Sequence, residues 1–305
     1  MNRYPSEFAP TPLIPLQLDA TGPAVWCKLE FLNPSGSTKD RIARYILEKA
    51  VREGRLSQGA TVIEASSGST SIAMALMCAQ LRLRFIAVMP EGVSNERVLI
   101  IRAYGGEICL TAKAGGVRGA IDESVRMAHE TGAFLPRQFS NPENAEAHQF
   151  GTAPELLRQI PGGLVGAVVS GVGTGGTLVG LYHGCKPTNP GVRGFLARPV
   201  NLVHTTEEEC CSFSSCIPGV VDCMSTIYRA VDFPEIETIE IDDREAIETT
   251  RRLIALGFPV GPSSGLNYCA ALEAGKRLPA ESAIVTVFPD RMERYFTGEL
   301  FEPFR

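Results

Sequence analysis

The chain alternates between two patterns of apolar and polar positions. Short apolar runs rich in β-branched residues are followed by segments whose apolar residues recur at helical spacing. Because parallel strands joined by helices produce this alternation, we predict an α/β fold of mostly parallel, twisted sheets covered by helices. Strands are predicted at residues 24–30, 61–65, 85–89, 107–110, 166–169, 194–196, 238–241 and 283–288. Helices are predicted at residues 40–52, 70–80, 95–104, 145–159, 176–182, 244–256 and 264–274, with another inside 116–130.

The length of the chain favours two lobes. At 305 residues it exceeds the size at which one compact core is the usual arrangement. The series of strand and helix pairs divides near residues 141–144, without a low-complexity linker. We therefore expect two closely packed lobes with a cleft between them, and ligands at the carboxyl ends of the strands.

Composition and charge narrow the class of protein. Hydrophobic residues make up 44% and charged residues 21% of the chain, which is ordinary for a packed globular protein. The net charge is −5 and the basic residues are dispersed, so we expect no nucleic-acid partner. The sequence has no apolar run of about 20 residues and no signal-peptide pattern at its start. We therefore expect no membrane partner and a cytoplasmic location.

The nine cysteines fall into two groups. Five stand singly in apolar contexts and are expected to be reduced core residues. The other four crowd into one segment, as Cys210, Cys211, Cys216 and Cys223. Their spacing differs from the paired C-x-x-C of zinc sites and no histidine follows within ligand range, so we predict no metal site. An apolar entrance segment is favoured over a redox switch.

Lys39 occupies an unusual position among the six lysines. It lies between a predicted strand and a predicted helix, in the run Asn33-Pro-Ser-Gly-Ser-Thr-Lys39-Asp40-Arg41. The positive end of a helix dipole favours the neutral form of a lysine, which assists Schiff-base formation with an aldehyde. A solvated lysine in a first helical turn is the alternative.

A glycine-rich turn, Gly171-Val-Gly-Thr-Gly-Gly-Thr177, joins a predicted strand to the next predicted helix. Backbone N–H groups at such a turn can converge on a phosphate. Its glycines also satisfy the G-x-G-x-x-G pattern of nicotinamide dinucleotide sites. That alternative requires an acidic residue at the end of the following strand, where the chain instead has Ala197-Arg198. A single phosphate is the better interpretation.

Two serine-rich segments precede other helices. In Ser66-Ser-Gly-Ser-Thr70, hydroxyls and N–H groups at a helix start suit a carboxylate. Gly261-Pro-Ser-Ser-Gly265 precedes the predicted helix 264–274. An ordinary helix cap is the alternative for both segments.

In this order, the four segments resemble the cysteine synthase and cystathionine β-synthase family, the fold type II pyridoxal-phosphate enzymes. The run ending in Arg41 is similar to the family's lysine motif, and Ser67-Gly-Ser-Thr70 to its substrate loop. Gln138-Phe-Ser-Asn141 resembles its second carboxylate contact, and Ser170-Gly-Val-Gly-Thr-Gly-Gly-Thr177 its phosphate loop. The likeness runs over nearly the whole chain.

The resemblance implies pyridoxal 5′-phosphate as cofactor, in the cleft between a smaller mobile lobe (35–144) and a larger lobe (1–34 with 145–305). It implies that Lys39 forms the Schiff base and moves the α-proton, and that Ser263 faces the pyridine nitrogen. The phosphate-binding residues are implied to be Gly173, Thr174, Gly175, Gly176 and Thr177. The substrate-binding residues are implied to be Ser66, Ser67, Gly68, Thr70 and Gln138. A homodimer with a small amino-acid substrate is also implied.

The reaction class follows from these implied roles. A serine cannot keep the pyridine nitrogen protonated, so loss of a β-leaving group is favoured over transamination or decarboxylation. We expect β-replacement on O-acetylserine or O-phosphoserine through an α-aminoacrylate intermediate, with sulfide as nucleophile. A thiol or amino-acid nucleophile and a β-eliminating lyase remain alternatives. A catalytically weak binding protein is the alternative from another class, and the retained Lys39 and phosphate loop disfavour it.

The chain also departs from the family pattern. Ser69 stands where the family usually has an asparagine that contacts the cofactor, and Ser71 replaces a glycine. The segment 210–229 lacks the glycine-rich turn of cysteine synthases. The Pro289-Asp-Arg291 run resembles siderophore-pathway members that use phosphoserine. His148 also matches a family position, and we interpret it as a hydrogen-bonded structural residue.

Overall fold

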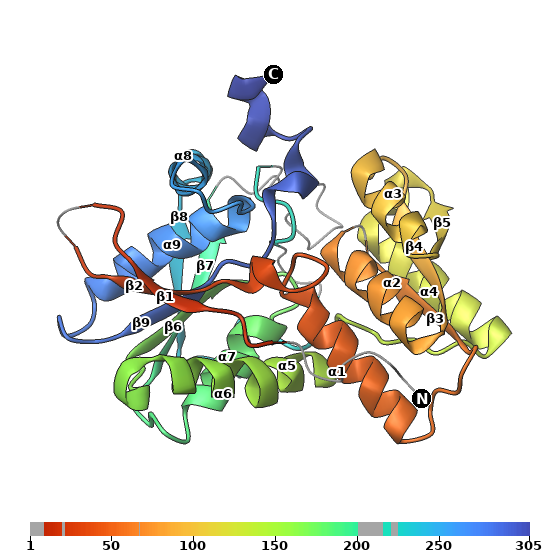
Figure 1. Ribbon diagram of the computed structural model, residues 1–305, viewed down its shortest axis with the longest axis horizontal. Helices are drawn as coiled ribbons and strands as arrows, with labels where there is room; N and C mark the ends of the chain where they lie inside the picture. The colour runs from red at the N-terminus through yellow and green to blue at the C-terminus, as the bar shows by residue number, and fades with distance from the viewer. Residues whose placement is uncertain (1–8, 20–21, 67, 201–215, 221–224) are drawn as a thin grey trace. The chain divides into compact units, whose positions relative to one another are not determined.

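The computed structural model describes residues 9–19, 22–66, 68–200, 216–220 and 225–305 (Figure 1). These residues form two compact units. Unit 1 comprises Asn33–Glu143 with Ala9, and unit 2 comprises Pro10–Leu32 with Asn144–Arg305. The boundaries and the mobility expected of the lobes stay predictions. Each unit has its own sheet and its own apolar core, as the α/β prediction requires.

Unit 1 is built on a three-stranded parallel sheet of order β3-β4-β5. Its main helices and strands, in chain order, are α1 (Lys39–Arg52), β3 (Thr61–Ala65), α2 (Ser69–Leu81), β4 (Arg84–Pro90), α3 (Asn95–Ala103), β5 (Glu107–Thr111) and α4 (Gly116–Thr131).

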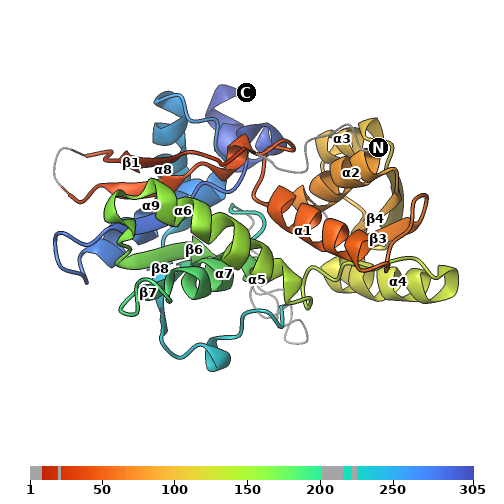
Figure 2. The same cartoon turned by 60° about the horizontal axis from the view of Figure 1, so that its bottom comes forward.

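Apolar residues cover both faces of this sheet. Val62, Phe85 and Met89 pack with α1, α2 and α3 on one face, and Ile63 and Val88 pack with α4 on the other (Figure 2). Alternate residues of each strand therefore enter different cores, as the period of two in a strand requires. The substrate loop, defined here as residues 66–70, joins the carboxyl end of β3 to α2.

Unit 2 is built on a six-stranded sheet of order β1-β2-β9-β6-β7-β8, in which only the β1–β2 pair is antiparallel. Its main elements are β1 (Leu13–Leu16), β2 (Val25–Lys28), η3 (His148–Thr152), α6 (Ala153–Gln159), β6 (Ala167–Gly171), α7 (Gly176–Cys185), β7 (Arg193–Pro199), β8 (Ile236–Ile241), α8 (Asp243–Ala255), α9 (Pro262–Gly275) and β9 (Ile284–Val287). Helix α5 (Glu143–Ala147) starts at the last residue of unit 1.

Helices cover both faces of the larger sheet. Helices α8 and α9 lie on one face, and α6 and α7 lie on the other (Figure 1). The central strands β6 and β9 are buried on both faces, which accounts for their mostly apolar sequences. The phosphate loop, defined here as residues 171–177, joins the carboxyl end of β6 to α7.

Two elements differ from the sequence prediction. The helix predicted at 145–159 is interrupted by a π-helical turn, η3, between α5 and α6. Strand β1 was not predicted, since a four-residue edge strand that contains Pro15 carries a weak pattern. None of the described helices is long and apolar enough to cross a membrane.

Candidate active site

Lys39 is the first residue of α1, as the position of its motif predicts. The turn before it is closed by the Gly36 N–H, which donates to the Asn33 carbonyl at 2.7 Å. The fully buried Asp40 carboxylate accepts from the Ser35 N–H at 2.6 Å and from the Ser35 hydroxyl. Because Asp40 fastens this turn to the first turn of α1, the half-buried Lys39 has a defined place at the helix N-terminus.

Thr38, which precedes Lys39, has a buried hydroxyl. The residue is 4% exposed, and its Oγ1 has no hydrogen-bond partner in the part of the chain that the structure describes. A buried hydroxyl without a partner costs on the order of 1–3 kcal/mol. Such an atom beside Lys39 fits a position where a ligand supplies the missing hydrogen bond.

The substrate loop wraps around the N-terminus of α2. The Gly68 N–H donates to Ser66 Oγ at 3.2 Å, and Ser71 Oγ donates to the Ser66 carbonyl at 2.8 Å. Among the described residues, no side chain caps α2 and no acidic residue lies in its first turn. The positive end of the helix dipole is therefore directed at a position suited to an anion. Ser67 lies outside the described residues.

Gln138 is distant in sequence but contacts the substrate loop. Its Oε1 accepts from Thr70 Oγ1 at 2.6 Å, and its Nε2 donates to the Ala65 carbonyl at 2.7 Å. Both Thr70 and Gln138 are 3% exposed. Unit 1 thus contains Ser66, Gly68, Thr70 and Gln138, the described residues assigned to the substrate, together with Ser69, which was assigned to the cofactor. Since Thr70 donates its proton to Gln138, backbone N–H groups are the main candidates for binding a carboxylate.

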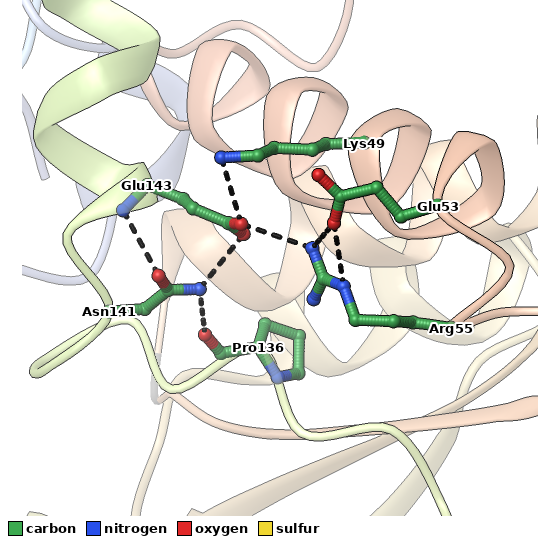
Figure 3. Close-up of polar contacts among 6 residues, drawn as sticks. All are labelled: Lys49, Glu53, Arg55, Pro136, Asn141 and Glu143. Atoms are coloured by element: carbon green, nitrogen blue, oxygen red, sulfur yellow. Dashed lines mark hydrogen bonds and ion pairs between the residues drawn. The ribbon is translucent and has the colours of Figure 1, made fainter.

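A polar cluster joins α1 to the segment that follows Gln138 (Figure 3). The Glu143 carboxylate contacts Lys49 Nζ at 3.2 Å and Arg55 Nη2 at 3.0 Å. Asn141 Nδ2 donates to the Pro136 carbonyl and to Glu143 Oε2, at 3.0 and 3.2 Å. The helix that begins at Lys39 is therefore connected to the segment that carries Gln138.

The phosphate loop has no room for a side chain at three of its glycines, Gly173, Gly175 and Gly176. A Cβ at Gly173 would lie 2.3 Å from the Gly219 carbonyl oxygen, and one at Gly175 would lie 2.3 Å from Tyr228 Cβ. Gly175 also has a φ of +84°, which favours glycine. The backbone N–H groups of this loop can therefore approach a phosphate without obstruction.

Thr174 is held from two sides. Its Oγ1 accepts from Asn144 Nδ2 at 2.9 Å, which leaves its own proton available to a phosphate oxygen. Its carbonyl accepts from Ser225 Oγ at 2.6 Å. Gly219, with a φ of +94°, lies against the same loop. The segment expected to lack a glycine-rich turn thus keeps one glycine beside the phosphate loop.

The π-helical turn places His148 behind the phosphate loop. His148 is 1% exposed, with Nε2 3.3 Å from Thr177 Oγ1 and Nδ1 3.0 Å from Thr152 Oγ1. A Cβ at Gly180 would lie 2.6 Å from His148 Cβ, so α7 packs closely against this turn. The interpretation of His148 as a hydrogen-bonded structural residue is confirmed.

Ser263 lies in the first turn of α9 and is half-buried. The next residue, Ser264, is fully buried, and its Oγ has no hydrogen-bond partner among the described residues. Asn267 connects this helix to the sheet, because its Oδ1 accepts from the Gly171 N–H at 2.7 Å and its Nδ2 donates to the Val287 carbonyl at 2.8 Å. Asn267 thereby fixes α9 relative to the phosphate loop.

The Pro289-Asp-Arg291 run supports the start of α9. The Gly261 N–H donates to the Asp290 carbonyl at 2.9 Å, and Tyr295 OH donates to Asp290 Oδ2 at 2.6 Å. A Cβ at Gly261 would lie 2.4 Å from Asp290 Oδ1. Asp290 and Tyr295 therefore act as a support for the N-terminus of α9, a role that the sequence alone did not predict.

These residues fit pyridoxal phosphate. In unit 1, Lys39 begins a helix next to the buried Thr38 hydroxyl, which has no partner among the described residues. In unit 2, glycines leave the backbone of the phosphate loop without side chains, and the buried Ser264 hydroxyl likewise has no partner among the described residues. The roles assigned to the individual residues stay proposals.

The cysteine-rich segment contributes little to the described structure. Cys216 Sγ donates to Glu299 Oε2 at 2.8 Å. Cys210, Cys211 and Cys223 lie outside the described residues. Among the residues that the structure describes, no group of three or more His, Cys, Asp or Glu side chains could hold a metal ion.

Comparisons with known proteins agree with the fold and the motifs. A family model described as "Pyridoxal-phosphate dependent enzyme" matches residues 5–290. The chain is 36% identical to the cysteine synthase of Staphylococcus aureus over 303 residues, covering 95% of this chain and 94% of that protein.

Two crystal structures are similar over most of their length. A hydrogen sulfide-producing enzyme from Fusobacterium nucleatum is 32% identical, with a TM-score of 0.88 over 97% of this chain and 90% of that one. The O-acetylserine dependent cystathionine beta-synthase from Helicobacter pylori is 32% identical, with a TM-score of 0.83 over 96% of each chain.

The matched length and identity settle the cofactor, and they favour the single-phosphate interpretation of the glycine-rich turn over a dinucleotide site. The two sheets with their helices are those of fold type II. The chain therefore belongs to the cysteine synthase family of pyridoxal-phosphate-dependent enzymes, which carry out β-replacement on serine derivatives.

Proposed function

We propose that this enzyme converts O-acetylserine or O-phosphoserine and sulfide into cysteine. The bond between Cβ and the ester oxygen breaks, acetate or phosphate leaves, and a bond forms between Cβ and sulfur. The observation that carries the proposal is the substrate loop. The N-terminus of α2, which no described side chain caps, would form with the Thr70–Gln138 pair a receptor for the α-carboxylate of an amino acid. Its relatives named cysteine synthase support the same choice.

Bound pyridoxal phosphate supplies an electron sink for bond cleavage at the substrate α-carbon. The chain provides the remaining functions. Lys39 attaches the cofactor and moves the α-proton, and Gly173 to Thr177 bind its phosphate. Ser263 would bind the ring nitrogen of the cofactor through its neutral hydroxyl, which would favour loss of the β-substituent over transamination. Ser66, Ser67, Gly68, Thr70 and Gln138 would orient the α-carboxylate, and Ser69 would bind the cofactor.

A thiol-bearing amino acid as nucleophile is the second candidate. Ser69 and Ser71 replace family residues in the substrate loop, and Ser71 has formed a new hydrogen bond to the Ser66 carbonyl. The Helicobacter pylori relative is named for O-acetylserine and cystathionine, a thioether of two amino acids. The same donor with a different acceptor would thus require no change at Lys39 or the phosphate loop.

A spectroscopic titration separates these possibilities. The holoenzyme is mixed with O-acetylserine and, separately, with O-phosphoserine, while the visible absorbance of the cofactor is followed. Sulfide, homocysteine or glutamate is then added. We expect one donor to change the spectrum and sulfide to restore it fastest, with cysteine as product. Faster recovery with homocysteine would favour the second candidate, pyruvate without added nucleophile would identify a lyase, and no change with either donor would refute the reaction class.

The proposed assembly is a homodimer, as the family resemblance implies. Sedimentation of the holoenzyme should give about twice the 32.9 kDa mass of the chain. A mass equal to one chain at micromolar concentration would contradict this part of the proposal.

A further inference from the structure

Glu64 is a buried carboxylate that the proposed reaction does not use. It lies in β3, one residue before the strand ends, and is 2% exposed. Its Oε1 accepts from the Ala65 N–H at 2.9 Å, and its Oε2 accepts from the Gln138 N–H at 3.1 Å. Both oxygens of one side chain are therefore bonded to the backbone next to the residues assigned to the substrate.

The segment that carries Gln138 depends on β3 for its position. The Phe134 N–H donates to the Thr61 carbonyl, and the Ile63 N–H donates to the Phe134 carbonyl, each at 2.9 Å. Arg137 has a φ of +57°, in the left-handed region that non-glycine residues rarely adopt. Immediately after this unfavourable residue, Glu64 holds the N–H of Gln138. The contact therefore stabilises the chain conformation that presents the Gln138 side chain to the substrate loop.

A continuous set of hydrogen bonds runs from Glu64 to the start of α2. Glu64 holds the Gln138 backbone, the Gln138 side chain holds the Ala65 carbonyl and Thr70, and Thr70 lies in the first turn of α2. Each of these residues is buried. Movement of the Gln138 backbone would thus be transmitted to Thr70.

The surroundings of Glu64 require a side chain that can accept hydrogen bonds at both of its terminal atoms. Desolvation raises the pKa of its carboxyl to about 8, while N–H donors from Gln138, Ala65 and Arg137 oppose that rise. Ionised or protonated, a carboxyl group keeps lone pairs on both oxygens for these N–H donors, whereas a glutamine offers one acceptor oxygen and an NH₂ group that only donates. In a Glu64→Gln variant, one of the two N–H groups would therefore face an NH₂ group.

We propose that Glu64 is a positioning residue for substrate recognition, which orients the carboxylate receptor of the substrate loop by holding the backbone of Gln138. The inference rests on the proposed function, because it concerns the same receptor. Glu64 does not touch the substrate; it acts through Gln138 and Thr70. Its removal changes how the enzyme recognises the α-carboxylate and leaves cofactor binding intact.

The test measures carboxylate recognition without turnover. Binding of L-serine and of L-serinamide to the holoenzyme is measured by calorimetry in the wild type and in Glu64→Gln. Serinamide keeps the amine and hydroxyl but has no carboxylate. We expect the wild type to prefer serine, and the variant to lose about tenfold of that preference, the equivalent of one hydrogen bond to a charged group. Affinity for pyridoxal phosphate should change by less than about twofold.

Glu30→Gln is the matched control. Glu30 is also fully buried, but it lies in unit 2 and accepts from the Thr11 hydroxyl at 2.6 Å. It should lower stability without changing the preference for serine. Steady-state kinetics add a second readout, since KM for the activated serine should rise about tenfold with kcat nearly unchanged.

Different results overturn different parts of the account. If Glu64→Gln retains the full preference of the wild type for serine over serinamide, the role of Glu64 is refuted. The proposed function is unaffected by that result. A fall in kcat or melting temperature without a change in preference also refutes it, because a structural role alone would produce that result. A wild type that binds serine and serinamide equally refutes the carboxylate receptor, and with it both proposals.

Discussion

The phosphate loop in unit 2 and the substrate loop in unit 1 are built for anions in different ways. In the phosphate loop, a Cβ added at Gly173 or Gly175 would collide with Gly219 or Tyr228. The substrate loop instead depends on side chains, with Glu64, Thr70 and Gln138 hydrogen-bonded in series. A loop whose glycines are enclosed permits little variation, whereas a loop whose backbone is positioned by side chains can change its specificity through single substitutions.

The largest effect is expected on catalysis, from a substitution that leaves both loops unchanged. Lys39→Ala should lower kcat by at least about 10³-fold, because the proposed amine for cofactor attachment and proton transfer is lost. The phosphate loop should still retain the cofactor without a covalent bond. Borohydride reduction followed by mass spectrometry of the wild type should find the cofactor on Lys39.

Lys49→Ala, in the same helix, is the control for this variant. It removes an ion pair with Glu143 and should leave turnover within about twofold of the wild type, as expected for a partly exposed pair. Cofactor found on Lys49 or Lys28 after reduction would show that the assignment of Lys39 is wrong.

The second prediction tests the phosphate loop. Gly175→Val should weaken pyridoxal phosphate binding at least about 100-fold, since its Cβ would overlap Tyr228 and displace the backbone donors. Gly257→Val has the same left-handed strain, with a φ of +91°, but nothing within 4 Å of its Cβ. Fluorescence titration should therefore show normal cofactor affinity for Gly257→Val. Equal losses in both variants would argue for general strain.

The pH dependence of stability tests the burial of Glu64, which supports the substrate loop and has no counterpart among the described residues of the phosphate loop. The pKa of Glu64 is about 8 in the folded chain and near 4.5 when solvated, so burial favours its protonated form. Its contribution to stability is complete below pH 4.5 and is lost as pH rises through about 8, at a rate of up to about 1.4 kcal/mol per pH unit. The free energy of unfolding of the wild type should thus fall relative to that of Glu64→Gln between these pH values. A constant difference from urea titrations across this range would contradict the raised pKa.

The smallest expected effect concerns specificity. Ser69→Asn restores the usual family residue and should raise kcat/KM with sulfide, relative to homocysteine, by about fivefold. Ser71→Gly is its partner variant, which removes the hydrogen bond to the Ser66 carbonyl. No change in either ratio would place the determinant of specificity elsewhere, with residues 210–229 as the next segment to exchange.

Most of the fold could be predicted from the sequence because the buried strands and amphipathic helices have strong periods. The π-helical turn at His148 could not, since one extra residue per turn leaves the apolar pattern of the helix nearly unchanged. Its cause lies in tertiary contact, where Gly180 of α7 meets the backbone of Ala145 and Gln149. Strand β1 escaped prediction because it is short and contains a proline.

The candidate site could be predicted where its residues lie close together in the sequence. Lys39, the substrate loop and the phosphate loop each occupy one short motif. The side chains that support them are isolated polar residues in apolar elements. Glu64 lies in a strand, Asn267 in a buried helix, and Ser225 after a cysteine-rich segment. Their roles appear only when the fold brings Glu64 to Gln138, Asn267 to Gly171, and Ser225 to Thr174.

The central claim is that a serine derivative loses its β-substituent on this enzyme and gains sulfur. The most direct measurement incubates the holoenzyme with O-acetylserine, and in parallel with O-phosphoserine, together with sulfide, and quantifies products by mass spectrometry. The account predicts cysteine in amounts equal to the acetate or phosphate released, and none with Lys39→Ala. Release of neither leaving group from the wild type would contradict it.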